Sequence, residues 1–220
     1  MARDYEGAEE AERRELDRVG AFSDGVFAIA ITLLVLNIEI PSGESLSDGL
    51  HELDDDLTAY FIGFAVMGKF WYEHHKLFSA IVRTDRGLIV VNLLLLSLIS
   101  LMPFTTNVLG SFDGPLAVTI YALNVAAAAA ASGWTEIVAF NAGLAPAGAL
   151  REKSVLVRSN AWVVAIFLLS IPIAYVVDPT VGQLFWLTLL LVPHLTVRRG
   201  ERGPGGDGPV PQDPQREEGR

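Results

Sequence analysis

Long runs of apolar residues alternate with short polar segments along most of this 220-residue chain. A helix needs about 20 mainly apolar residues to cross the hydrocarbon core of a bilayer, where it satisfies its own backbone hydrogen bonds. Six runs approach that length, and we expect each to form a transmembrane helix. They span residues 19–40, 58–81, 87–109, 116–140, 156–177 and 181–197. The last run is the shortest and contains Pro193, so its end is the hardest to place.

This pattern predicts an all-α integral membrane protein in three parts. Residues 1–17 form a charged cytoplasmic segment, in which 4–17 should fold as a short helix at the membrane surface. Residues 18–198 hold the six helices. Residues 199–220 are rich in glycine, proline and charge, which is typical of a disordered cytoplasmic tail. The two halves of the chain share no motif, so we expect one copy of the six-helix unit.

Composition narrows the function classes further. Hydrophobic residues make up 51% of the chain and charged residues only 19%, a balance that favours a membrane protein over a soluble domain. The chain has no cysteine, which excludes disulfides, thiolate metal sites and cysteine nucleophiles. The net charge of -10 argues against nucleic acid as a partner, because phosphate binding needs clustered lysine and arginine.

The positions of lysine and arginine predict the orientation in the cell membrane. With the N-terminus inside, almost all of them fall in inside segments or adjoining helix ends, and the outside loops hold none. Lys69, within the second predicted span, is the only lysine or arginine left over. This division predicts that both termini are cytoplasmic. The inside group is Arg3, Arg13, Arg14, Arg18, Lys76, Arg83, Arg86, Arg151, Lys153, Arg158, Arg198, Arg199, Arg202, Arg216 and Arg220.

The first helix carries the most informative polar residues. Ser23 and Asp24 lie near its inner end, where a charge is costly unless it is paired or faces water. Because Arg18 is six positions away, we expect Asp24 to find its partner on another helix. Ile29, Leu33 and Leu36 follow at helical spacing and form one apolar stripe. Such a stripe alone is also explained by lipid contact or core packing.

The pattern Arg-x-x-x-Phe-Ser-Asp, formed by Arg18, Phe22, Ser23 and Asp24, resembles the signature of the transmembrane protein 175 family. The family consists of potassium-permeable channels of animal endosomes and lysosomes, with bacterial relatives. The resemblance covers roughly residues 15–200 and is most specific in the first three helices. Further matching positions are Trp71, His74, His75, Leu77 and Phe78 in the second helix, and Asn92, Leu101, Pro103, Phe104 and Thr106 in the third.

The resemblance implies a homotetramer of single-repeat subunits whose first helices line a central pore. In this chain Ile29 takes the position of the hydrophobic constriction, with Leu33 and Leu36 as further rings. Thr32 takes the position of a threonine linked to potassium preference. Four apolar side chains around an axis can gate a pore by excluding water. The permeant ion implied is potassium, with membrane lipid around the protein and no cofactor.

Other readings remain open at this stage. The Thr-Val-Gly-Tyr-Gly potassium filter is not present, since Gln183 and Leu184 follow Thr180-Val181-Gly182. A secondary transporter is one alternative, although internal repeats are missing. Another is a membrane-embedded enzyme or scaffold that uses Glu73, His74 and His75, although we find no catalytic triad or phosphate loop.

Two groups of polar residues have competing interpretations. His74 and His75 point about 100° apart on a helix and cannot chelate one metal ion together, so we expect no metal site. We expect one histidine to bond the cluster of Arg18, Ser23 and Asp24. Glu136 in the fourth helix could relay protons or simply pair with its neighbours.

Overall fold

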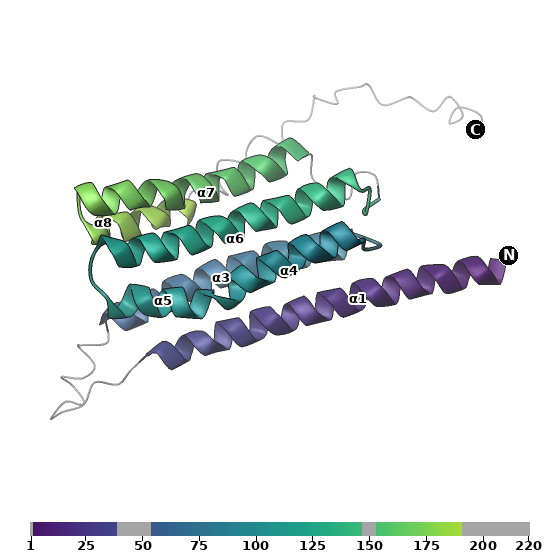
Figure 1. Cartoon of the computed structure of the whole chain (residues 1–220), viewed down its shortest axis with the longest axis horizontal. Coiled ribbons are helices and arrows are strands. Elements are labelled where there is room, and N and C mark those ends of the chain that lie inside the picture. The colour runs from purple at the N-terminus through teal and green to yellow at the C-terminus, as the bar shows by residue number, and fades with distance from the viewer. Residues whose placement is uncertain (1, 39–53, 147–152, 191–220) are drawn as a thin grey trace, which may run out of the picture.

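The computed structural model describes residues 2–38, 54–146 and 153–190, and all of its regular elements are helical. The long helices run side by side in a bundle, with α1 along one edge and α7 and α8 on the opposite side (Figure 1). The elements are α1 (Ala2–Leu33), η1 (Leu34–Asn37), α3 (Asp54–Ala80), α4 (Arg86–Ser100), α5 (Met102–Ser111), α6 (Pro115–Asn141), α7 (Lys153–Val176), α8 (Pro179–Leu184) and η2 (Phe185–Leu190).

Each of the six predicted apolar runs coincides with helical structure, within the described residues. The sixth run is helical as far as residue 190, and its remainder lies outside the described residues. By length and apolar composition, three helical stretches of the described chain can cross a membrane: Glu10–Asn37, Arg86–Ser111 and Pro115–Asn141. A shorter apolar helix spans Asn160–Val176. The chain is therefore an all-helical protein with membrane-spanning helices, while the number of six spans stays a prediction.

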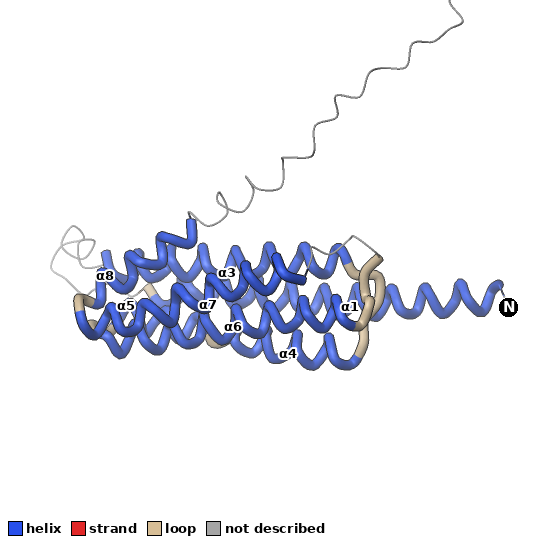
Figure 2. Tube along the Cα trace, turned by 90° about the horizontal axis from the view of Figure 1, so that it is seen from above, coloured by secondary structure: helices blue, strands red, loops and turns tan. Residues whose placement is uncertain are grey.

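The charged N-terminal segment differs from the expectation. Residues 4–17 do not form a separate surface helix but continue without a break into the first apolar run as α1. Alanine, glutamate and arginine dominate this segment and are all strong helix formers, so nothing in the sequence stops the helix. As a result, α1 projects well beyond the bundle at its N-terminal end (Figures 1 and 2).

The third apolar run is helical but broken. α4 ends at Ser100, Leu101 forms a turn, and α5 begins at Met102 with Pro103 in its first turn. Proline is well suited to the start of a helix, because it lacks the backbone N–H that would otherwise find no partner there. Pro172, by contrast, lies inside α7, which continues through it.

Polar side chains and glycine define several helix ends. The carboxylate of Asp85 accepts a hydrogen bond of 2.7 Å from the backbone N–H of Leu88, which caps the start of α4. Asp178 caps α8 in the same way through Thr180. Beyond α6, Gly143 adopts a φ of 60°, and the N–H of Leu144 bonds the carbonyl of Ala139, as in a Schellman motif.

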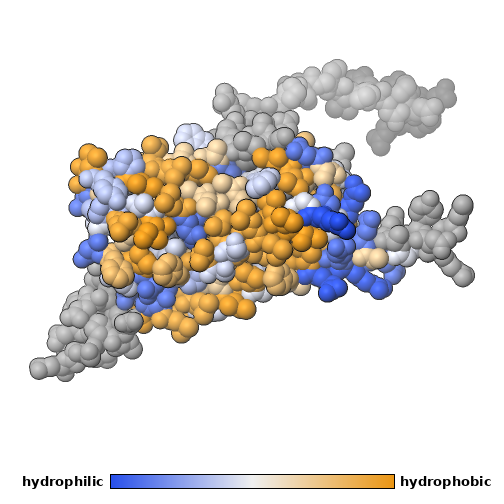
Figure 3. Space-filling model, in the orientation of Figure 1, coloured by the Kyte–Doolittle hydropathy of each residue, from blue (hydrophilic) through white to orange (hydrophobic). Residues whose placement is uncertain are grey.

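Two apolar clusters hold the bundle together. The larger cluster joins α1, α3, α4, α5, α6 and α7, and it includes an aromatic group formed by Tyr121, Phe167 and Trp186. The smaller cluster includes Leu16, Leu77 and Leu88 and lies toward the predicted cytoplasmic end. Outside, hydrophobic residues cover most of the face in Figure 3, while hydrophilic residues gather where α1 leaves the bundle. This distribution is the one expected of a protein surrounded by lipid.

Candidate functional site in the first helix

The membrane part of α1 has two clearly different faces. Ser23, Phe27 and Ala30 of α1, and Leu34 directly after it in η1, are at most 2% exposed and pack against the rest of the described subunit. Their spacing of three or four residues places them on one side of the helix. That side meets α3, α4 and α5, so the sequence folds α1 against the bundle along a single stripe.

The predicted pore residues lie on the other face. Ile29 is 62% exposed, Leu33 41% and Leu36 71%, so the described part of the same subunit leaves much of each side chain uncovered. Thr32 is exposed beside them, and its hydroxyl donates to the carbonyl of Ile29 at 2.8 Å. The structure thus brings Ile29, Thr32 and Leu33 of α1 together with Leu36 of η1 on one exposed surface.

A buried chain of hydrogen bonds joins α1, α4 and α3. The hydroxyl of Ser23 donates to the carbonyl of Val19 at 2.9 Å and accepts from Nδ2 of Asn92 at 3.0 Å. Oδ1 of Asn92 lies 2.9 Å from Nε2 of His74. Because an amide oxygen only accepts, His74 is the donor in this bond. All three side chains are at most 3% exposed.

Aromatic contacts fix the orientation of His74. Its ring stacks on Phe78 with centroids 4.2 Å apart and lies 5.5 Å from the ring of Phe27. The neighbouring His75 is exposed and stacks on Trp71 at 5.6 Å. The two histidines therefore point in different directions. The described residues contain no group of three potential ligands placed to hold a metal ion.

Asp24 forms a second link between α1 and α3. Its Oδ1 accepts a hydrogen bond of 3.0 Å from Nε1 of Trp71, so the expected partner on another helix is confirmed. His74 reaches Ser23 only through Asn92. Arg18 makes no hydrogen bond or ion pair with any described side chain, and the structure leaves it outside both links. Phe22 is exposed next to them.

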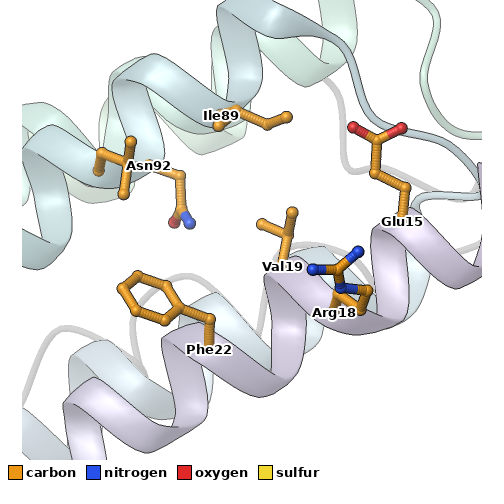
Figure 4. Close-up of a pocket in the computed structure, with 7 residues that line it drawn as sticks. Glu15, Arg18, Val19, Phe22, Ile89 and Asn92 are labelled. Atoms are coloured by element: carbon orange, nitrogen blue, oxygen red, sulfur yellow. The ribbon is translucent and has the colours of Figure 1, made fainter.

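Two shallow grooves flank this part of α1. The first has a volume of about 390 Å³ and lies between α1 and α4, with Val19 and Phe22 facing Ile89 and Asn92 across it (Figure 4). Glu15 and Arg18 stand at one end. The second groove lies between α1 and α3, and its lining consists of Leu16, Asp17, Gly20, Ala21, Asp24, His74, His75, Phe78 and Ser79.

Sequence reasoning missed the polar contacts at the break between α4 and α5. Nδ2 of Asn37 donates to the carbonyl of Pro103 at 2.7 Å, and Nδ2 of Asn124 donates to the carbonyl of Leu98 at 3.3 Å. Asn124 also bonds Thr105 at 3.2 Å. Asparagines within apolar runs, together with a proline, were the available signal, because each must find a partner in lipid.

Glu136 and the residues of the alternative enzyme site also have bonding partners in the structure. Oε2 of Glu136 accepts a hydrogen bond of 2.9 Å from Asn160 of α7 in a buried environment. Glu73 forms an ion pair of 2.8 Å with Lys69, one turn earlier on α3. Glu73, His74 and His75 therefore have separate partners, and the structure does not bring the three side chains to a common centre.

Long apolar helices in an all-helical bundle define a multi-pass membrane protein, and comparison with known proteins shows which family it resembles. Residues 18–103 match the family of the endosomal/lysosomal potassium channel TMEM175. The resemblance predicted from the Arg-x-x-x-Phe-Ser-Asp pattern is therefore confirmed. The matched region contains α3 and α4 completely, together with the membrane part of α1.

Individual relatives agree with this family. A potassium channel from Streptomyces collinus is 43% identical over 101 residues, which are 44% of this chain and 49% of that protein. A potassium channel from Chamaesiphon minutus is 39% identical over 123 residues, 52% of this chain and 61% of the other. The endosomal/lysosomal proton channel TMEM175 of Gallus gallus is 36% identical over 107 residues, 44% of this chain and 21% of that protein. The matches thus span about half to three fifths of the bacterial relatives.

The fold matches as well. A crystal structure of a lysosomal potassium-selective channel TMEM175 homolog from Chamaesiphon minutus superposes with a TM-score of 0.69 and 27% identity. The match covers 85% of this chain and 99% of that one. These relatives are ion channels rather than enzymes.

Proposed function

We propose that this chain is a potassium-permeable cation channel of the cell membrane, with both termini in the cytoplasm. In this proposal four subunits surround one axis, and their α1 helices line the pore with Ile29, Leu33 and Leu36 as apolar rings. The observation that carries the proposal is the exposed face of α1 and η1, on which these three large side chains are 41–71% exposed in the single subunit. The names of the bacterial relatives support potassium as the permeant ion.

The opposite side of α1 has a structural role in this channel. It is tied to α3 and α4 by the buried chain of Ser23, Asn92 and His74, and to α3 also by the exposed hydrogen bond between Asp24 and Trp71. Such links fix the rotation of α1 about its own axis, because each hydrogen bond tolerates little displacement. The apolar face is then held toward the axis, where a dry constriction of four isoleucines can gate by dewetting.

Potassium preference in this proposal does not come from a carbonyl filter. Thr180, Val181 and Gly182 lie within the helix α8, where backbone carbonyls point along the helix axis rather than into a pore. Thr32 is the polar side chain beside the rings, and its hydroxyl is bonded to the carbonyl of Ile29. We assign the ion preference to this ring of threonines.

Potassium flux into liposomes tests the proposed pore. Ile29→Asn places four amides around the constriction, which lets water enter, so flux should rise above wild type. Ala28→Asn is the matched control, because Ala28 lies about 100° around the same helix. Its flux should stay at the wild-type level. Higher flux for Ala28→Asn than for Ile29→Asn would overturn the pore-facing stripe, and unchanged flux in both would remove α1 from the permeation path at this depth.

A secondary transporter is the alternative that a broken helix would favour. Here, however, the break between α4 and α5 is closed by Asn37 and Asn124, whose amides occupy the carbonyls of Pro103 and Leu98. Those carbonyls are engaged by the protein itself rather than presented to an ion. Single-channel recording separates the two functions, because unitary currents far above transporter turnover require an open pore, whereas stoichiometric coupled flux requires a transporter.

A further inference from the structure

The exposed face of the first helix ends in a turn of a different kind. α1 stops at Leu33, and η1 (Leu34–Asn37) follows it as a 3₁₀ turn. The N–H of Ile38 bonds the carbonyl of Val35 at 3.3 Å, which is the spacing of a 3₁₀ helix. In such a turn, residues three apart lie directly above one another, so Leu36 stands over Leu33. Both leucines are exposed, and their side chains face the same way.

A hydrogen bond from Asn37 ties this turn to α5. Nδ2 of Asn37 donates to the carbonyl of Pro103 at 2.7 Å. Leu34, at the other end of the turn, is fully buried in the larger apolar cluster. Leu36 lies between these two attachments and is 71% exposed. Because turns at helix ends fray unless they are held, the bond of Asn37 is what holds the turn directly beyond Leu36.

The acceptor of this bond is itself held in place. Pro103 and its neighbour Met102 are buried at the start of α5. Asn124 of α6 donates to the carbonyl of Leu98 at 3.3 Å and to the hydroxyl of Thr105 at 3.2 Å, one on each side of the break between α4 and α5. The carbonyl of Pro103 is therefore a fixed anchor, supplied by the body of the subunit, for the last turn of the exposed helix.

We propose that Asn37 is a positioning residue of the channel, which holds the outer ring of Leu36 in line with the ring of Leu33. The inference rests on the proposed function, in which both rings face the axis. Two rings in line lengthen the dry part of the pore, and a longer dry part favours the closed channel. Without the bond the last turn frays, the four Leu36 side chains spread, and water enters from the outer end. Asn37 thus acts through Leu36 and needs no contact with the ion.

Single-channel recording of the full chain in potassium tests this role, because only assembled channels carry current. Asn37→Ala removes the amide and should raise the ratio of open to closed time about two- to tenfold, the factor by which one neutral hydrogen bond shifts an equilibrium. Leu36→Ala removes the ring and should raise the ratio too. In the Leu36→Ala background, Asn37→Ala should add no further increase, since the side chain that it positions is gone. Independent, additive increases would overturn the positioning role.

Asn124→Ala is the matched control, because its amide bonds Leu98 and Thr105 at the same break rather than α1 or η1. Its ratio should equal that of wild type, and an increase as large as that of Asn37→Ala would show general loosening and overturn the proposal. Ile29→Asn, recorded in parallel, separates the positioning role from the pore. Raised current for Ile29→Asn with an unchanged ratio for Asn37→Ala would overturn the positioning role alone. Unchanged current in both would overturn the pore and, with it, this role.

Discussion

At the scale of single residues, Asn92 joins the first three long helices, α1, α3 and α4, to one another. Its amide joins Ser23 of α1 to His74 of α3, although Asn92 itself lies on α4. One side chain thus satisfies two others in a region where water is not available to replace them. Asn92 therefore fixes the position of α1 indirectly and needs no contact with an ion to affect the channel.

Replacing Asn92 with leucine should destabilise the protein. Asn92→Leu keeps a similar volume but removes both interhelical hydrogen bonds, and we expect a loss of about 1–3 kcal/mol in the free energy of unfolding. Thermal unfolding in detergent, followed by circular dichroism, measures this loss. Ser97→Ala is the control on the same helix, because Ser97 is exposed and its hydroxyl donates to the carbonyl of Leu94, within the same helix. Equal melting of Asn92→Leu and wild type would show that the network is not structural.

The sequence predicts these polar contacts only in part. A carboxylate inside a membrane helix needs a partner, so the link from Asp24 to another helix could be expected, and Trp71 provides it. The role of Asn92 as the connection between Ser23 and His74 could not be expected in the same way. Helical periodicity states which residues share a face, but it carries no information on which side chains meet across helices.

At the scale of helices, two prolines in apolar runs have opposite outcomes. The helix is broken just before Pro103, whereas α7 continues through Pro172. The carbonyls near the first break are taken by Asn37 and Asn124, from η1 and α6. Partners so distant in the sequence cannot be found from local pattern. The six apolar runs themselves were predictable, because the length and composition of such runs are local properties.

The helices also approach one another closely at Gly63 of α3. A Cβ atom at this position would lie 2.8 Å from Oγ1 and 3.0 Å from Cγ2 of Thr106, and 3.2 Å from Leu34. Thr106 is β-branched and stiff, so it cannot easily move aside. Gly63 is thus the point at which α3 packs against α5 and η1, as small residues do at membrane helix interfaces.

Two alanine substitutions on α3 should therefore change the free energy of unfolding in opposite directions. Gly63→Ala should lower the free energy of unfolding by about 1–3 kcal/mol through overpacking. Gly68→Ala meets no atom within 4 Å and should raise it by about 0.5–1 kcal/mol, since alanine favours a helix over glycine. Thermal unfolding of both variants under one detergent condition is the measurement. A Gly63→Ala protein as stable as the Gly68→Ala protein would contradict the close approach.

For the whole molecule, the main property to test is the orientation of the helices across the membrane. The connection between α5 and α6 is predicted outside and carries Asp113, whereas the connection between α3 and α4 is predicted inside and carries Arg83. This arrangement follows the usual excess of lysine and arginine on the cytoplasmic side. It can be tested cleanly, because the chain contains no cysteine.

Cysteine labelling in intact cells provides that test. Ser111→Cys and Val82→Cys introduce one exposed thiol each, at the end of α5 and directly after α3. A membrane-impermeant maleimide added from outside should label Ser111→Cys and not Val82→Cys until the cells are opened. Labelling of Val82→Cys alone in intact cells would reverse the orientation, and with it the assignment of the cytoplasmic termini.

The unequal burial of the apolar helices has a consequence for biogenesis. Within one subunit only 22% of the apolar stretch of α1 is buried, compared with 44% for α4 and α5 together and 67% for α6. The ribosome synthesises α1 before the other described helices, so α1 enters the bilayer before any of them is present to cover its side chains. Because few side chains of α1 are covered by the rest of the subunit, α1 can stay stable in the bilayer alone while the translocon releases the later segments. The alanine-rich α6 arrives when α4 has already been inserted, and α7 follows directly to cover its other side.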